Sequence, residues 1–217
     1  MNITEKYRGG NAIPDLEVVE FWKESLKDLT DVIITDHYSF PKNGKLFTDK
    51  FDEYIKASKL NNLKGLDTYE HRSFVAGTSQ TFDSFWMRNH DRRFRCFKGE
   101  FFYHKANWKK FHTWCYLEDE DILPDDAVVI SLPFSDYGME HPKMREILDE
   151  CERWGVPVLI DCAYYVIGEG INFDFTKYDC IEDITFSLSK GFHLSNRIRG
   201  GIRYTKKYYD DNIHIMN

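Results

Sequence analysis

Two runs of the chain, Val128-Val129-Ile130 and Val158-Leu159-Ile160, are apolar at every position. A strand with one wet face alternates apolar and polar residues, so continuous apolar runs are typical of strands that are covered on both faces. Together with five similar β-rich runs they give seven candidate strands, at residues 73–76, 94–98, 112–117, 127–132, 157–163, 183–189 and 201–204.

Helical patterns lie between several of these runs. We expect helices at residues 81–89 and 142–154, the second from the helical spacing of its apolar residues Met144, Ile147, Leu148, Cys151 and Trp154. Strands that alternate with helices predict an α/β fold, here a three-layer α/β/α domain with a mostly parallel seven-stranded sheet.

The predicted organisation has three parts. Residues 1–70 form an N-terminal extension of helices and loops, with helices expected near 18–29 and 50–60. Residues 71–206 form the large domain, and residues 207–217 are expected to start a truncated C-terminal segment.

Composition narrows the class of protein. The chain has 217 residues, 42% of them hydrophobic and 30% charged, with a net charge of −7, which indicates a soluble protein and disfavours nucleic acid as a partner. No apolar stretch is long enough for a membrane span, and the first residues lack the apolar core of a signal peptide. Five scattered cysteines favour reduced thiols in the cytoplasm, and eight histidines without metal-ligand spacing predict no metal site.

Four chemistry-bearing residues follow or end the candidate strands: Gly77, Ser135, Asp161 and Lys190. Ligands of open α/β sheets bind beyond the carboxyl ends of the strands. We therefore expect these residues to converge on one rim of the sheet.

Asp161 and Lys190 close two of the apolar runs, and each has two interpretations. A carboxylate after four apolar residues needs a partner, either a protonated pyridine nitrogen or the amides of a loop that it caps. A lysine drawn out of water attacks an aldehyde when it is neutral, whereas a solvated lysine at a strand end is the commoner case. Pyridoxal phosphate requires both a lysine and an anion.

Three other features point to the same ligand, each with a structural alternative. The turn Gly77-Thr78-Ser79 precedes a helix and either binds phosphate or is an ordinary cap. Arg197 and Arg199 either bind phosphate or belong to a solvated basic turn. Tyr103 either stacks on a planar ring or packs in the core.

The order of four motifs resembles a known family. Gly77-Thr78-Ser79-Gln80 is similar to a phosphate-binding turn, and the run from Leu132 to Gly138 to an N-P-x-N-P-x-G loop. Asp161-Cys162-Ala163-Tyr164 is similar to a D-x-A-Y element, and Ser187-Leu188-Ser189-Lys190 to an S-x-S-K element. Residues 70–206 thus resemble the large domain of fold-type I pyridoxal-phosphate enzymes, most closely the class I/II aminotransferases.

The resemblance implies roles residue by residue. Lys190 would form the Schiff base, Asp161 would hold the pyridine nitrogen, and Tyr164 would approach the ring hydroxyl. Tyr103 would stack on the ring. The phosphate would be held by Thr78, Ser79 and Ser187, with Gly77 and Ser189 in the same motifs.

Two departures affect the predicted site. Ser135 stands where the family has a ring-binding asparagine, and Ile198 stands where it has a phosphate-binding arginine. Either Arg197 or Arg199 would replace that arginine.

The resemblance predicts a pyridoxal 5'-phosphate-dependent aminotransferase that moves an amino group between an amino acid and a 2-oxo acid. It also implies a homodimer, or a partner chain that supplies the smaller C-terminal domain of the family. The alternative is a truncated, non-catalytic protein that binds the cofactor or a partner. An unrelated nucleotide-binding α/β protein is disfavoured, because neither G-x-G-x-x-G nor G-x-x-x-x-G-K-[ST] occurs.

Overall fold

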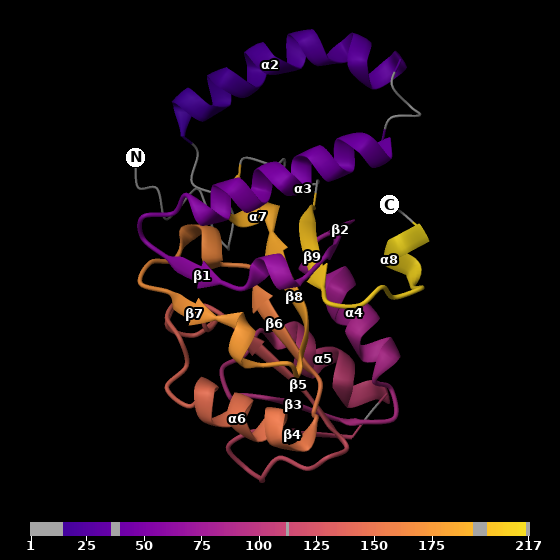
Figure 1. The fold of residues 1–217 in the computed structure, drawn as a ribbon, viewed down its shortest axis with the longest axis vertical. Coiled ribbons are helices and arrows are strands. Elements are labelled where there is room, and N and C mark those ends of the chain that lie inside the picture. Colours follow the sequence, from indigo (N-terminus) through magenta and orange to yellow (C-terminus); the bar gives the residue numbers. More distant parts are fainter. Residues whose placement is uncertain (1–14, 36–39, 112, 193–198, 216–217) are drawn as a thin grey trace.

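A seven-stranded sheet forms the centre of the computed structural model, which describes residues 15–35, 40–111, 113–192 and 199–215 (Figure 1). The strand order is β2-β9-β8-β6-β5-β3-β4. β9 is antiparallel to both of its neighbours, and the other strands run parallel to one another. The strands are β2 (His71–Val75), β3 (Arg93–Cys96), β4 (Trp114–Tyr116), β5 (Asp126–Ser131), β6 (Val158–Cys162), β8 (Ile181–Ser187) and β9 (Gly201–Thr205).

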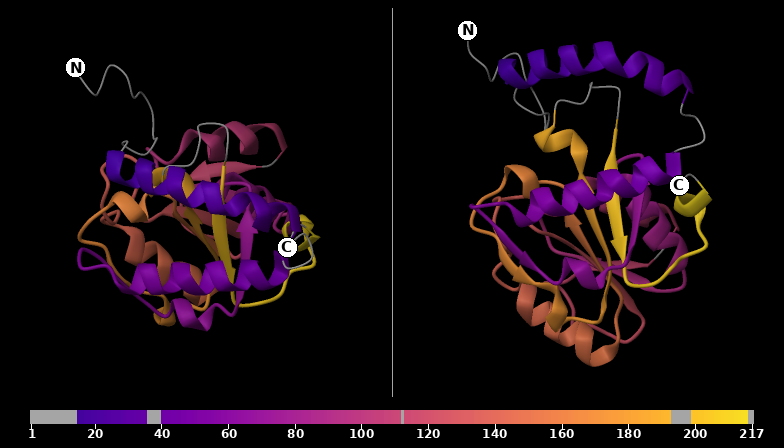
Figure 2. Two further views of the ribbon diagram at one scale, coloured as in Figure 1. Left: turned by 90° about the horizontal axis from the view of Figure 1, so that it is seen from above. Right: turned by 45° about the horizontal axis from the view of Figure 1, so that its top comes forward.

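Helices cover both faces of this sheet (Figures 1 and 2). On β5, Ala127 and Val129 pack in one apolar cluster with side chains of α4 (Thr78–Arg88) and α5 (Phe102–Phe111). Val128 and Ile130 point the other way, into a larger cluster with α3 (Phe40–Lys56) and α6 (Met144–Trp154). The continuous apolar run of β5 thus serves two cores, and the predicted three-layer α/β/α fold is confirmed.

The sequence of α6 explains both its position and its end. Met144, Ile147, Leu148 and Cys151 are buried along one helical face, against the sheet. Gly155 ends the helix with φ 63° and ψ 34°, a left-handed conformation that glycine adopts without a steric penalty.

The remaining elements are short or peripheral. β1 (Asn62–Lys64) and β7 (Asn172–Asp174) form a separate two-stranded parallel sheet. The 20-residue helix α2 (Leu16–Thr35) lies outermost, beyond α3 (Figure 1). The short helical elements are η1 (Leu66–Thr68), η2 (Tyr165–Ile167), η3 (Phe175–Lys177), α7 (Leu188–Gly191) and α8 (Asn212–Ile215).

All seven predicted strands of the main sheet are present, with bounds that differ from the prediction by at most two residues, and the end of β8 is the one that affects the site. β8 stops at Ser187, whose hydroxyl accepts a hydrogen bond from the Ser189 amide and thereby starts α7. Lys190 therefore lies in a helical turn after the strand.

Other predicted elements differ in their bounds or were missed. The helix predicted at 50–60 is α3, which ends at Lys56. The β1–β7 sheet was missed, because three-residue strands are too short for a periodic pattern to emerge. α5 was also missed, since its aromatic residues do not follow a clear helical period.

The proposed division at residue 70 stays a prediction. Phe51 and Ile55 of α3, together with Leu66 and Tyr69, share a core with the main sheet. In the described ranges, no helix is both long enough and apolar enough to span a membrane.

Candidate functional site

A cavity lies at the rim where the parallel strands end, and we call it the rim cavity. Its enclosed volume is about 70 Å³. The lining comes from the ends of β6 and β8, from the segments after β2, β3, β5, β6 and β8, and from the segment before the antiparallel β9. Its residues are Gly77, Thr78, Ser79, Phe101, Ser135, Asp161, Ala163, Tyr164, Ser187, Ser189, Lys190 and Arg199. The predicted convergence on one rim therefore occurs.

Asp161 forms part of the floor of the rim cavity. It belongs to β6, between Ser131 of β5 and Thr185 of β8, and is only 5% exposed. One carboxylate oxygen accepts a hydrogen bond of 3.0 Å from the Ala163 amide. Burial raises the pKa of Asp161 to about 8, with repulsion from Glu100 as the next cause. Both effects favour the protonated form of the Asp161 carboxyl.

Lys190 approaches the same cavity from α7. Its Nζ lies 5.0 Å from the centroid of the Tyr164 ring, within the range of a cation–π contact. The positive charge of Lys190 also acts on Asp161 and opposes the rise in its pKa. Because β6 and β8 are adjacent and parallel, the segments that follow them bring this lysine and this carboxylate to one cavity.

The N-terminus of α4 forms another wall. Gly77 precedes the helix with φ 84° and ψ 163°, a conformation that is essentially restricted to glycine. The amides of Thr78 and Ser79 come first in the helix and have no intrahelical acceptor. Their position at the positive end of an 11-residue helix suits an anionic ligand group.

The two candidate arginines have different outcomes. Arg199 lines the rim cavity and approaches Gly77 so closely that a Cβ atom at position 77 would lie 3.5 Å from the Cβ of Arg199. Arg197 lies outside the described residues.

Tyr103 does not line the rim cavity. Its ring stacks on Trp86 with centroids 5.6 Å apart, and its hydroxyl donates to Asp83 at 3.2 Å. Phe101 lies in the lining instead. The sequence interpretation chose Tyr103 and not Phe101, and the start of α5 turns Tyr103 toward α4.

Ser135 lines the cavity and belongs to a small polar network. Its hydroxyl lies 3.2 Å from the Ser131 hydroxyl and 3.4 Å from Glu100. Sequence reasoning missed Glu100 because a glutamate next to Gly99 is typical of a solvated loop. Only the folded chain shows that burial raises the pKa of this carboxyl.

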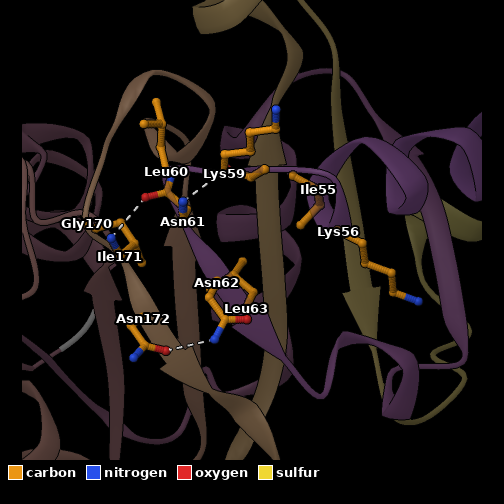
Figure 3. A pocket seen from close by; sticks show the side chains of 11 residues that line it. Ile55, Lys56, Lys59, Leu60, Asn61, Asn62, Leu63, Gly170, Ile171 and Asn172 are labelled. Carbon is orange, nitrogen blue, oxygen red and sulfur yellow. Dashed lines mark hydrogen bonds between the residues drawn. The ribbon is translucent and has the colours of Figure 1, made fainter.

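A second, more open cavity of about 530 Å³ lies beside the β1–β7 sheet (Figure 3). Asn61 there donates to the Gly168 carbonyl and accepts from the Ile171 amide, and Asn62 donates to Asn172. These amide groups bind the protein itself, and the side chains of Lys56 and Lys59 point apart (Figure 3). The rim cavity, with its buried carboxyl and converging polar groups, is the better candidate site.

The described residues contain no group of three or more histidine, cysteine, aspartate or glutamate side chains arranged to hold a metal ion. The polar groups of the rim cavity are instead one lysine, one buried carboxyl, hydroxyls and one arginine.

Comparisons with known proteins give matches at the level of structure. No family model and no curated protein matches the sequence. Histidinol-phosphate aminotransferase from Clostridium acetobutylicum matches with a TM-score of 0.60 and 15% identity over 93% of this chain and 60% of its own. L-threonine-O-3-phosphate decarboxylase from Porphyromonas gingivalis matches with a TM-score of 0.62 and 13% identity over 90% and 58%.

A third solved structure is the PLP-bound C-S lyase from Staphylococcus hominis, with a TM-score of 0.50 and 15% identity over 74% of this chain and 51% of that one. The chain thus spans between half and three fifths of the length of these three enzymes. At such low identity the similarity concerns the fold. The chain has the α/β fold of the pyridoxal-phosphate-dependent aminotransferases and related fold-type I enzymes.

Proposed function

We propose that the rim cavity binds pyridoxal 5'-phosphate through Lys190 and that the chain works as the large domain of an aminotransferase-like enzyme. The substrates would be an amino acid and a 2-oxo acid. The observation that carries the proposal is the meeting of Lys190, the buried Asp161 and the N-terminus of α4 in one cavity.

The donor set fits the cofactor. The pyridine nitrogen requires an anion, and Asp161 is a buried carboxyl with a single backbone hydrogen bond. The phosphate requires several donors, and the amides of Thr78 and Ser79 lie in one wall together with Arg199. When bound, pyridoxal phosphate supplies an aldehyde that joins amines and a ring that accepts electrons.

The size of the cavity sets a further condition. Pockets for small ligands usually measure about 300–1,000 Å³, well above the enclosed volume here. Phe101 is 36% exposed and Arg199 is also exposed, and binding would require these two side chains to move outward. Side-chain rearrangement of this kind is common on ligand binding.

Each protein group would then have one task. Asp161 would hold the proton on the ring nitrogen, and Lys190 would hold the aldehyde carbon and later carry the α-proton of the substrate. Tyr164 would approach the ring hydroxyl, and Phe101, which replaces Tyr103 in this role, would cover one face of the ring. Thr78, Ser79, Ser187 and Arg199 would bind the phosphate.

The test is covalent labelling. Protein incubated with pyridoxal phosphate is expected to gain a visible absorption band, and borohydride should then fix the label on Lys190 in a peptide map. Lys105→Ala is a matched control, because Lys105 is also half-buried but lies outside the lining. A label on another lysine, or the same band in Lys190→Ala, would contradict the proposal.

A non-catalytic protein that binds the cofactor or a partner is the second candidate. The observation in its favour is that Arg199 is the single arginine in the described lining of the rim cavity. If Arg199 binds phosphate, no described arginine remains in this lining for the substrate carboxylate, and orientation contributes roughly 7–11 kcal/mol to such reactions. Single-turnover conversion of the cofactor by a panel of amino acids separates the candidates. Fast conversion supports the enzyme, and binding without conversion supports the non-catalytic protein.

The oligomeric form follows the same proposal. The resemblance to the class I/II aminotransferases implies self-association. We therefore propose a homodimer or a complex with a second chain. Light scattering of the purified protein, alone and with cofactor, measures this directly.

A further inference from the structure

The carboxylate of Glu100 is held by several hydrogen-bond donors. Glu100 lies between β3 and α5, and its carboxylate accepts hydrogen bonds from the Ser131 amide at 2.7 Å and the Ser131 hydroxyl at 2.6 Å. The Phe101 amide donates to it at 3.1 Å, and the Ser135 hydroxyl lies at 3.4 Å. These donors fix the carboxylate immediately behind the lining of the rim cavity.

The fixed carboxylate is a neighbour of Asp161. Ser131 is the register partner of Asp161 across the β5–β6 pair, and the Leu132 amide donates to the Asp161 carbonyl at 2.8 Å. Ser135, which Glu100 contacts, lines the cavity together with Asp161. Ser131 thus links the two acidic residues, because it is hydrogen-bonded to Glu100 and is the register partner of Asp161.

We propose that Glu100 is a positioning residue whose charge makes Asp161 selective for a cationic group of the ligand. The proposal rests on the proposed function, in which that group is the pyridine nitrogen. Two neighbouring buried carboxyls resist being ionised together, so one of them retains a proton in the ligand-free chain. Asp161 gives this proton to the ring nitrogen, and the new positive charge is stabilised by both carboxylates.

Three titratable groups close to the pair do not compete for this role. Cys96 of β3 and Tyr137 after β5 face Glu100, and the pKa of each is raised by burial. Cys162 of β6 is next to Asp161, and burial raises its pKa well above the usual value. These groups stay neutral between pH 5 and 9, and Lys190 of α7 is the described cation that acts on Asp161.

The first experiment follows Asp161 without any ligand. In protein with ¹³C-labelled aspartate carboxyls, the resonance of Asp161, assigned with Asp161→Asn, is titrated in wild type, Glu100→Gln and Ser135→Ala. Glu100→Gln removes the charge and is expected to lower the pKa of Asp161 by roughly one to two. Ser135→Ala removes a lining hydroxyl but keeps the charge, so the titration should stay near that of wild type. An unchanged titration in Glu100→Gln overturns the proposal.

The wild-type protein provides the same test if Glu100→Gln does not fold. Coupled carboxyls show each other's titration step, so glutamate and aspartate labels should report shared inflections. Two independent titration curves would overturn the proposal.

The second experiment measures selectivity. Pyridoxal phosphate is compared by equilibrium dialysis with its carbocyclic analogue, in which a carbon replaces the ring nitrogen. Wild type should prefer the pyridine, and Glu100→Gln should reduce that preference about tenfold, equal to about 1.4 kcal/mol. Equal losses of affinity for both compounds would assign Glu100 a structural role only. If neither compound binds wild type, the proposed function fails, while the titration still decides the coupling of the two carboxyls.

Discussion

Asp161→Asn is expected to stabilise the ligand-free protein, although it removes a proposed functional group. The folded chain holds the pKa of Asp161 near 8, because the carboxyl is buried. An aspartate in an unfolded chain titrates near about 3.9. Between these two values the folded state binds one more proton than the unfolded state, so its stability falls as the pH rises.

The magnitude follows from this difference. Asp161 contributes in full below the unfolded pKa, and its contribution is lost progressively as the pH rises toward the folded pKa. One pH unit corresponds to about 1.4 kcal/mol, so the interval from pH 5 to pH 7 costs wild type about 2.7 kcal/mol. Asparagine keeps an oxygen for the Ala163 amide and has no proton to release. The variant escapes this loss.

The assay is urea unfolding of both proteins at pH 5 and pH 7. The unfolding free energy of the variant relative to wild type should rise by about 2.7 kcal/mol over the interval. Glu100 is present in both proteins, so its own titration largely cancels. A relative stability that changes by less than about 0.5 kcal/mol would refute the reasoning, since it would place the pKa of Asp161 near its unfolded value.

Two further substitution pairs test the assignment of side chains around the cavity. Phe101→Ala should weaken pyridoxal-phosphate binding about 2–10-fold, measured by fluorescence titration, with little change in stability. Tyr103→Ala should cost about 1–3 kcal/mol of stability, measured by urea unfolding, and leave the affinity unchanged. The reverse pattern would restore Tyr103 as the stacking residue. Gly77→Ala should cost about 1–3 kcal/mol because of its backbone conformation and also weaken phosphate binding, whereas Gly155→Ala should cost about 1 kcal/mol and leave binding intact. Equal effects of the two glycine substitutions on binding would remove α4 from the site.

The sequence predicted the parts of the fold that depend on local pattern. Val128, Val129 and Ile130 are apolar because β5 faces two cores. This pattern can be recognised in the sequence without a structure. The convergence of Asp161 and Lys190 followed from the rule that ligands bind beyond the carboxyl ends of parallel strands. Both inferences depend on repeated geometry and not on the details of packing.

The parts that could not be predicted depend on the exact start of an element or on tertiary contact. Phe101 and Tyr103 are two residues apart, and the start of α5 at Phe102 decides which of them faces the cavity. Glu100 becomes a buried acceptor only because Ser131 and Ser135 are brought against it by β5 and the loop that follows. No local pattern encodes either outcome.

The structural interpretation of Asp161, as the cap of a loop, does not account for its environment. A capping carboxylate is stabilised in its charged form by several donors, and two or three backbone amides are enough to lower its pKa. Asp161 has one such donor, from Ala163, and in the described part of the chain no lysine or arginine lies within ion-pair distance of it. Burial therefore dominates, and the carboxyl retains a proton that a basic group in the cavity would take up. A weakly basic ring nitrogen is such a group, and the same imbalance that destabilises the empty site would favour binding of this ligand.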